Sequence, residues 1–105
     1  MDSNYAALSR YESFKSDVNN IIAELNKAIQ PLESIVNSFD NSFVIDDNRA
    51  DNNKLTEFYN SLVKQRSFLN NTCIPSINNK IARIKAAIEE AERLERETLG
   101  LGVHS

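Results

Sequence analysis

Apolar residues between positions 11 and 39 recur at alternating spacings of three and four. Because an α-helix has 3.6 residues per turn, this heptad spacing returns every such side chain to one face. A second apolar row runs beside the first and is interrupted only by Lys15. The pattern therefore predicts a long helix whose apolar face is wider than a two-stranded seam. The first row is Tyr11, Phe14, Val18, Ile21, Leu25, Ala28, Leu32, Ile35 and Phe39, and the second is Leu8, Ile22, Ile29 and Val36.

Pro31 lies inside this predicted helix. Its ring clashes with the carbonyl of Lys27 and it lacks a backbone N–H, which costs about 3 kcal/mol in a helix interior. The heptad spacing nevertheless keeps its phase across Pro31, so we expect one bent helix over about residues 4–38.

Residues 39–53 break the period and are rich in Asp and Asn, whose side chains compete with helical hydrogen bonds. We expect this segment to form the tip between two helices. The apolar run Phe43, Val44 and Ile45 is predicted to fold back and plug the open end of the helix pair. Asp51, Asn52 or Asn53 is expected to cap the second helix.

The second helix is predicted over about residues 54–99. Leu69, Cys73, Ile77 and Ile81 are each four apart, which indicates a shift of register around Pro75 and a kink or break there. Gly100 is expected to end this helix and to leave a frayed tail over 100–105. The predicted fold is all-α: one domain, forming a long, coiled-coil-like antiparallel helical hairpin with a thin core.

Composition excludes several functional classes. The chain has a net charge of −3, which argues against nucleic acid as a partner because phosphate binding depends on Lys and Arg. No run approaches the 18 apolar residues of a membrane span, and the N-terminus lacks the basic and apolar regions of a signal peptide. We therefore expect no membrane insertion and a cytoplasmic protein.

Catalytic motifs are missing from the sequence. His104 is the only histidine and Cys73 the only cysteine, so neither a catalytic triad nor a Cys/His metal cluster can be assembled in one chain. Gly100 and Gly102 are the only glycines, which excludes a phosphate-binding loop. We expect no enzymatic activity, no cofactor and no small-molecule substrate, and we expect Cys73 to be a packed apolar residue.

One spacing resembles a calcium loop: Asp46, Asn48 and Glu57 would occupy its first, third and twelfth positions. Ala50 falls where the fifth position needs a ligand, and Asp51 falls where the sixth needs glycine. The spacing favours an acidic tip that caps the second helix over a metal site, and a calcium-dependent switch is the weakest of the functional hypotheses.

The wide apolar face is the main functional indication. Two helices cannot enclose all its rows, so either the chain folds back into a third helix at Pro75 or a partner covers the surplus. The partner could be another helical protein, or a second copy in a homodimeric four-helix bundle. The residues predicted to bind it are Leu8, Phe14, Val18, Ile22, Leu25, Ile29, Leu32 and Val36.

A chain of this length with two long antiparallel helices and a polar tip over residues 37–55 resembles the small helical partners of LXG-type toxins in bacterial type VII secretion, which are relatives of the WXG proteins. The chain has no Trp and no Gly at the tip, so the WXG signature itself is absent. No Tyr-x-x-x-Asp/Glu export signal occurs; the related spacing Phe43 to Asp47 lies at the tip. The resemblance implies an accessory or chaperone-like protein that bundles with a toxin's helical N-terminal domain, in the cytoplasm or during co-export.

Overall fold

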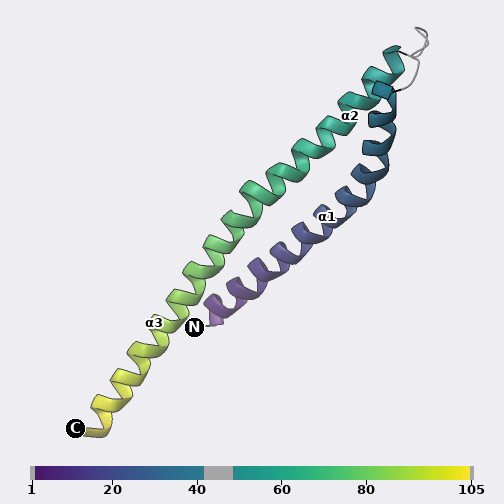
Figure 1. The fold of residues 1–105 in the computed structure, drawn as a ribbon. Coiled ribbons are helices and arrows are strands. Elements are labelled where there is room, and N and C mark those ends of the chain that lie inside the picture. Colours follow the sequence, from purple (N-terminus) through teal and green to yellow (C-terminus); the bar gives the residue numbers. More distant parts are fainter. Residues whose placement is uncertain (1, 42–48, 105) are drawn as a thin grey trace. The chain divides into compact units, whose positions relative to one another are not determined.

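The computed structural model describes residues 2–41 and 49–104, and both ranges are helical. Helix α1 spans Asp2–Asn41, α2 spans Arg49–Phe68 and α3 spans Ile74–His104 (Figure 1). A π-helical turn, Leu69–Cys73, joins α2 directly to α3. Neither described range contains a β-strand, so the predicted all-α class is confirmed.

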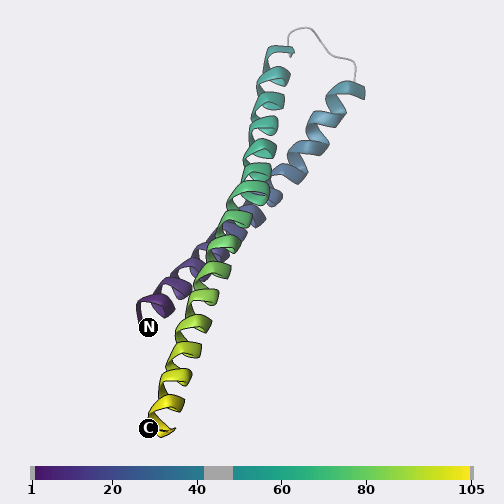
Figure 2. The ribbon, with the colours of Figure 1, turned by 90° about the vertical axis from the view of Figure 1, so that its left-hand side faces the viewer.

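The chain is divided into two compact units, each held together by its own internal contacts. The terminal unit contains residues 1–17 and 74–105, and the central unit contains residues 18–73. In the terminal unit Tyr5 contacts Glu92 and Tyr11 contacts Lys80, so the start of α1 runs antiparallel to α3. In the central unit Arg66 of α2 contacts Asn26 of α1, and the two helices run in opposite directions (Figures 1 and 2). Each unit is therefore an antiparallel helix pair.

Helix α1 is continuous and extends slightly beyond the predicted range on both sides. Pro31 lies within it and its side chain is exposed. Figure 1 shows α1 changing direction in its second half, the half that holds Pro31. A proline ring displaces the preceding turn without ending the helix when the residues beyond it are packed, and Leu32 and Val36 are both half-buried.

Helix α2 begins earlier than predicted, at Arg49. Asp51, Asn52 and Asn53 lie inside it, so the prediction that one of them is the N-cap is wrong. Asp51 is in the first turn, where a carboxylate stabilises the positive end of the helix dipole. Thr56 Oγ1 donates to the carbonyl of Asn52 at 2.9 Å, a bond made within a helix. The predicted plug formed by Phe43, Val44 and Ile45 lies outside the described residues.

The irregularity expected near Pro75 takes the form of the π-helical turn. Pro75 cannot donate to the carbonyl of Asn71, and its ring would collide with that carbonyl in a regular α-helix. A π turn adds one residue to the turn before the proline, which relieves this collision and rotates the following residues. The same extra residue explains why the apolar positions from Leu69 to Ile81 are spaced by four.

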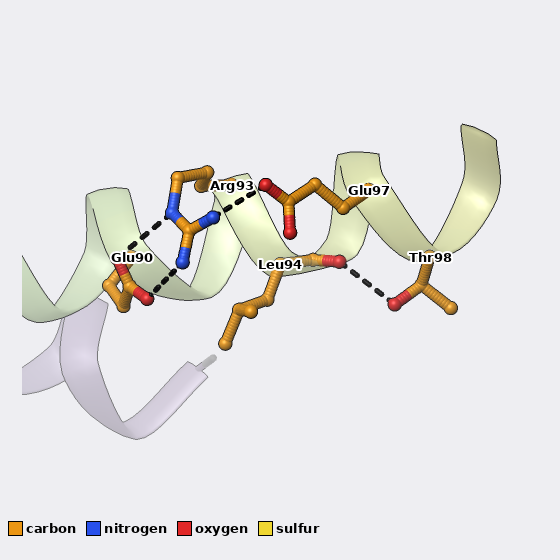
Figure 3. Close-up of polar contacts among 5 residues, drawn as sticks. All are labelled: Glu90, Arg93, Leu94, Glu97 and Thr98. Atoms are coloured by element: carbon orange, nitrogen blue, oxygen red, sulfur yellow. Dashed lines mark hydrogen bonds and ion pairs between the residues drawn. The ribbon is translucent and has the colours of Figure 1, made fainter. Parts of the chain in front are cut away.

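The C-terminal helix does not end at Gly100, because α3 continues to His104. Gly100 lacks the positive φ of a helix-terminating glycine, so the predicted frayed tail over 100–105 is wrong for the residues described. Arg93 lies between Glu90 and Glu97 (Figure 3), and its guanidinium nitrogens are 2.5 Å from a carboxylate oxygen of each. These pairs link successive turns near the end of α3 and support its continuation.

The core of each unit is a narrow seam of isoleucines. Ile22 and Ile29 are buried in the central unit, and Ile81, Ile84 and Ile88 are buried in the terminal unit. From Leu8 to Phe39 on α1 the buried and half-buried side chains recur at alternating spacings of three and four. These seam residues are Leu8, Tyr11, Lys15, Val18, Ile22, Leu25, Ile29, Leu32, Val36 and Phe39.

Candidate partner-binding surface

The remaining apolar row of α1 is exposed. We call Phe14, Ile21, Ala28 and Ile35 the flank row; its members are seven residues apart, and each directly precedes a seam residue. Phe14 is 44% exposed, Ile21 50% and Ile35 43%. The helix pairing therefore covers two of the three apolar rows of α1 and leaves the third in solvent.

The opposite side of the seam is polar. Tyr5 and Asn26 lie on this side, and each forms a hydrogen bond across its own unit. The Tyr5 hydroxyl donates to Glu92 Oε1 at 2.5 Å, and Arg66 Nη1 donates to Asn26 Oδ1 at 2.9 Å. Polar contacts to the paired helix therefore lie on one side of α1. The flank row on the other side consists of exposed apolar side chains.

In the central unit the exposed apolar surface extends onto α2. Phe58 is 54% exposed and Phe68 58%. Phe58 directly precedes the half-buried Tyr59, just as Ile35 directly precedes Val36. Equivalent heptad positions lie on the same side of an antiparallel pair, so the heptad phase places Phe58 on the flank-row side. An aromatic and two isoleucines on one side form a surface of the kind that protein partners cover.

Ile21 lies at a shallow hollow on this surface. The hollow has a volume of about 320 Å³ and is lined by Asn20, Ile21, Glu24 and Leu25, all on α1. Glu24 accepts a hydrogen bond from Lys27 at 3.3 Å, and both side chains are largely in solvent. The hollow is open and mainly apolar, which suits an inserted side chain from a partner helix better than a small ligand.

The residues predicted to bind a partner are mostly engaged within their own units. Ile29 is 2% exposed and Ile22 9%, which makes them core residues of the central unit. Leu8, Val18, Leu25, Leu32 and Val36 are half-buried seam residues, and Phe14 alone of the predicted set is exposed. Of the predicted set, only Phe14 therefore lies on the row that the helix pairing leaves exposed.

Lys15 interrupts the row of Ile22 and Ile29 in the sequence. It is half-buried at a seam position, where its aliphatic stem can pack while its ammonium group reaches solvent. The flank row belongs to the first apolar row identified in the sequence, and it contains no polar residue between Phe14 and Ile35.

In the terminal unit, Phe14 of the flank row forms an aromatic pair with Tyr11. The rings of Tyr11 and Phe14 meet edge to face with centroids 5.4 Å apart. The Lys80 ammonium lies 5.9 Å from the centroid of the Tyr11 ring, within the range of a cation–π interaction. Phe14 is thus supported from one side by Tyr11 and still offers nearly half of its surface to solvent.

In the terminal unit, hydrogen bonds and ion pairs between exposed side chains shift the pKa values of Tyr5 and Glu90. The hydrogen bond to Glu92, with a smaller effect of partial burial, raises the pKa of the Tyr5 phenol. The hydrogen bond and charge of Arg93 lower the pKa of Glu90. These are structural ion-pair and hydrogen-bond effects, and they involve neither a nucleophile nor a proton-transfer pair.

The described residues contain no group of three or more His, Cys, Asp or Glu side chains placed to hold a metal ion. The hypothetical calcium loop would require Arg49 to Glu57 to wrap around an ion, but these residues belong to α2. Its other ligands, Asp46 and Asn48, lie outside the described residues. Cys73 is a free, half-buried thiol in the π-helical turn.

No helix within residues 2–41 and 49–104 is both long enough and apolar enough to span a membrane. Comparisons with protein-family models, with curated proteins and with solved structures found no match.

Proposed function

We propose that this chain is a non-catalytic partner-binding protein whose flank row covers an apolar stripe on a second helical protein. One observation carries this proposal: Ile21 and Ile35 are about half exposed although the seam beside them is already filled by Ile22 and Ile29. Burying an isoleucine contributes about 1.5–3 kcal/mol relative to leaving it exposed. A row of such residues in solvent is a source of binding free energy.

We further propose that the partner is the helical N-terminal domain of an LXG-type toxin, and that the chain acts as a type VII secretion accessory or chaperone-like protein. The support is the resemblance described above together with the exposed row, which a client helix would complete into a bundle of three or more helices. Such a protein would meet its client in the cytoplasm and accompany it to export.

Co-purification with a candidate client tests the proposal. The candidate client is the helical N-terminal domain of an LXG-type toxin, expressed together with this chain. The double variant Ile21→Asp/Ile35→Asp is expected to abolish capture, because each substitution would bury a carboxylate against apolar surface. Ala23→Asp/Gln30→Asp is the matched control, since both residues are exposed on another side of α1 in the same unit. Equal capture by the two variants would exclude the flank row as the interface.

Self-association is the second candidate, and a specific observation favours it. Ile21 and Ile35 are symmetrically placed around Ala28, whose small side chain permits close approach of two helices. Two copies of α1 could therefore pack antiparallel about a two-fold axis at Ala28, as an isologous contact requires. Light scattering on the purified chain separates the candidates. A tight dimer that Ile21→Asp/Ile35→Asp converts to a monomer would assign the row to self-association.

A further inference from the structure

Basic and acidic residues are unevenly distributed along the chain. Residues 58–88 contain five of the twelve Lys and Arg residues and none of the fifteen Asp and Glu residues. This stretch covers the second half of α2, the π-helical turn and the first half of α3. A protein with a net charge of −3 thus contains a continuous stretch of 31 residues with positive charges only.

Two of these cations line a hollow in the terminal unit. The hollow has a volume of about 330 Å³. Lys80 lies against the Tyr11 ring, and Arg83 lies about one turn further along α3. Among the described residues neither cation forms an ion pair with a carboxylate; the ion pairs there belong to Lys27 and Arg93. We call this site the basic hollow, and its lining residues are Tyr11, Ser76, Ile77, Asn79, Lys80 and Arg83.

We propose that the basic hollow docks an acidic amphipathic helix, with a carboxylate of the partner between Lys80 and Arg83 and an apolar side chain against Phe14. This inference rests on the proposed function and adds the chemical class of the partner. Charge complementarity selects the acidic flank, because Lys80 and Arg83 form no ion pair among the described residues. Lys80 lies over the Tyr11 ring, which meets edge to face the ring of Phe14, and Phe14 is 44% exposed. On a helix, an acidic side chain and an apolar one three or four residues apart face the same way and can reach both groups.

The chemistry of the hollow favours a helix over nucleic acid. A protein that binds a phosphate backbone commonly makes six to ten phosphate contacts, and these need a dense array of cations. Here two cations share the hollow with Tyr11 and the half-buried Ile77, and the Tyr11 ring meets the ring of Phe14. A mixed surface of this kind matches one carboxylate and one apolar side chain on a single protein surface.

A designed peptide tests the proposal. The probe is a synthetic amphipathic helix of about three heptads with Leu at the seam positions and Glu along one flank. A matched peptide carries Lys in place of Glu. Binding to the full chain is measured by fluorescence anisotropy at low and moderate salt. The test variant is Lys80→Gln/Arg83→Gln, and the control is Lys64→Gln/Lys85→Gln, which removes the same charge from exposed positions of the same acid-free stretch outside the hollow.

The chain is expected to bind the Glu peptide and not the Lys peptide, with an affinity that falls as salt is added. Lys80→Gln/Arg83→Gln is expected to weaken binding about tenfold or more, and the control about threefold or less. Equal losses in the two variants, equal binding of both peptides, or tighter binding of a DNA duplex than of the Glu peptide would each overturn the proposal. If the peptide test fails but Ile21→Asp/Ile35→Asp still abolishes client capture, the basic hollow is excluded as a docking site and the proposed function is retained.

Discussion

Ile29 and Ile35 allow a direct test of how the structure divides the apolar rows of α1. They are the same residue type on the same helix, but Ile29 is 2% exposed and Ile35 is 43% exposed. Ile→Ala removes three carbon groups, each worth about 0.8 kcal/mol when buried. At Ile29 this gives about 2.4 kcal/mol, and the cavity left in a narrow seam raises the loss to about 3–4 kcal/mol. At Ile35 roughly half the transfer term applies without a cavity, so we expect about 1 kcal/mol.

Urea unfolding followed by circular dichroism measures both losses, and the slope with denaturant reports whether the transition stays two-state. A small domain has a stability of about 5–15 kcal/mol, so the Ile29→Ala loss is a large fraction of the total. Hydrogen exchange should place its effect in residues 18–73, the central unit. Equal losses for Ile29→Ala and Ile35→Ala would refute the assignment, because they would mean that the flank row is also buried in the isolated chain.

Two further predictions follow from the backbone and from titration. Pro31→Ala should raise the urea midpoint, because it removes an interior proline that costs about 3 kcal/mol, and the exposed ring leaves no cavity; a lower midpoint would mean that the bend is needed for packing. Tyr5 should ionise above its ordinary pKa, and Glu92→Gln should lower that pKa, as read from tyrosinate absorbance in a Tyr11→Phe/Tyr59→Phe background. The folded state holds the phenol proton more tightly than the unfolded state does. The contact therefore stabilises the terminal unit below about pH 10, and this stabilisation is lost as pH rises through the raised pKa of Tyr5. A Tyr5 pKa that Glu92→Gln leaves unchanged would rule out the contact.

The heptad spacing was sufficient to predict the helical class because it is a local property of the chain. The shift of register near Pro75 was also readable, since four-residue steps and a proline coincide there. Helix ends were less predictable. Asn-rich and Asp-rich segments favour turns on average, yet Asp51 in a first turn and the ion pairs of Arg93 favour helix where the sequence analysis expected a tip and a tail.

The seam could not be assigned from the sequence because α1 has three adjacent apolar rows and one partner helix covers two of them. The row of Tyr11, Val18 and Leu25 belongs to the seam under either choice. Which neighbouring row joins it depends on the side from which the partner helix packs, and that is a tertiary property. Lys15 belongs to the seam although it is charged, because its stem is apolar and can pack there.

Polar contacts on one side of α1 keep the flank row on the other side exposed. If both sides of the seam were apolar, exposure on one side could reflect a helix pair free to rotate about its axes. Hydrogen bonds from Tyr5 to Glu92 and from Arg66 to Asn26 hold the opposite side against its partner helix in each unit. Rotation that buried Ile21 or Ile35 would break such contacts and expose Ile22 or Ile29 in exchange. Covering the flank row without loss of the existing core therefore requires apolar surface from outside the helix pair.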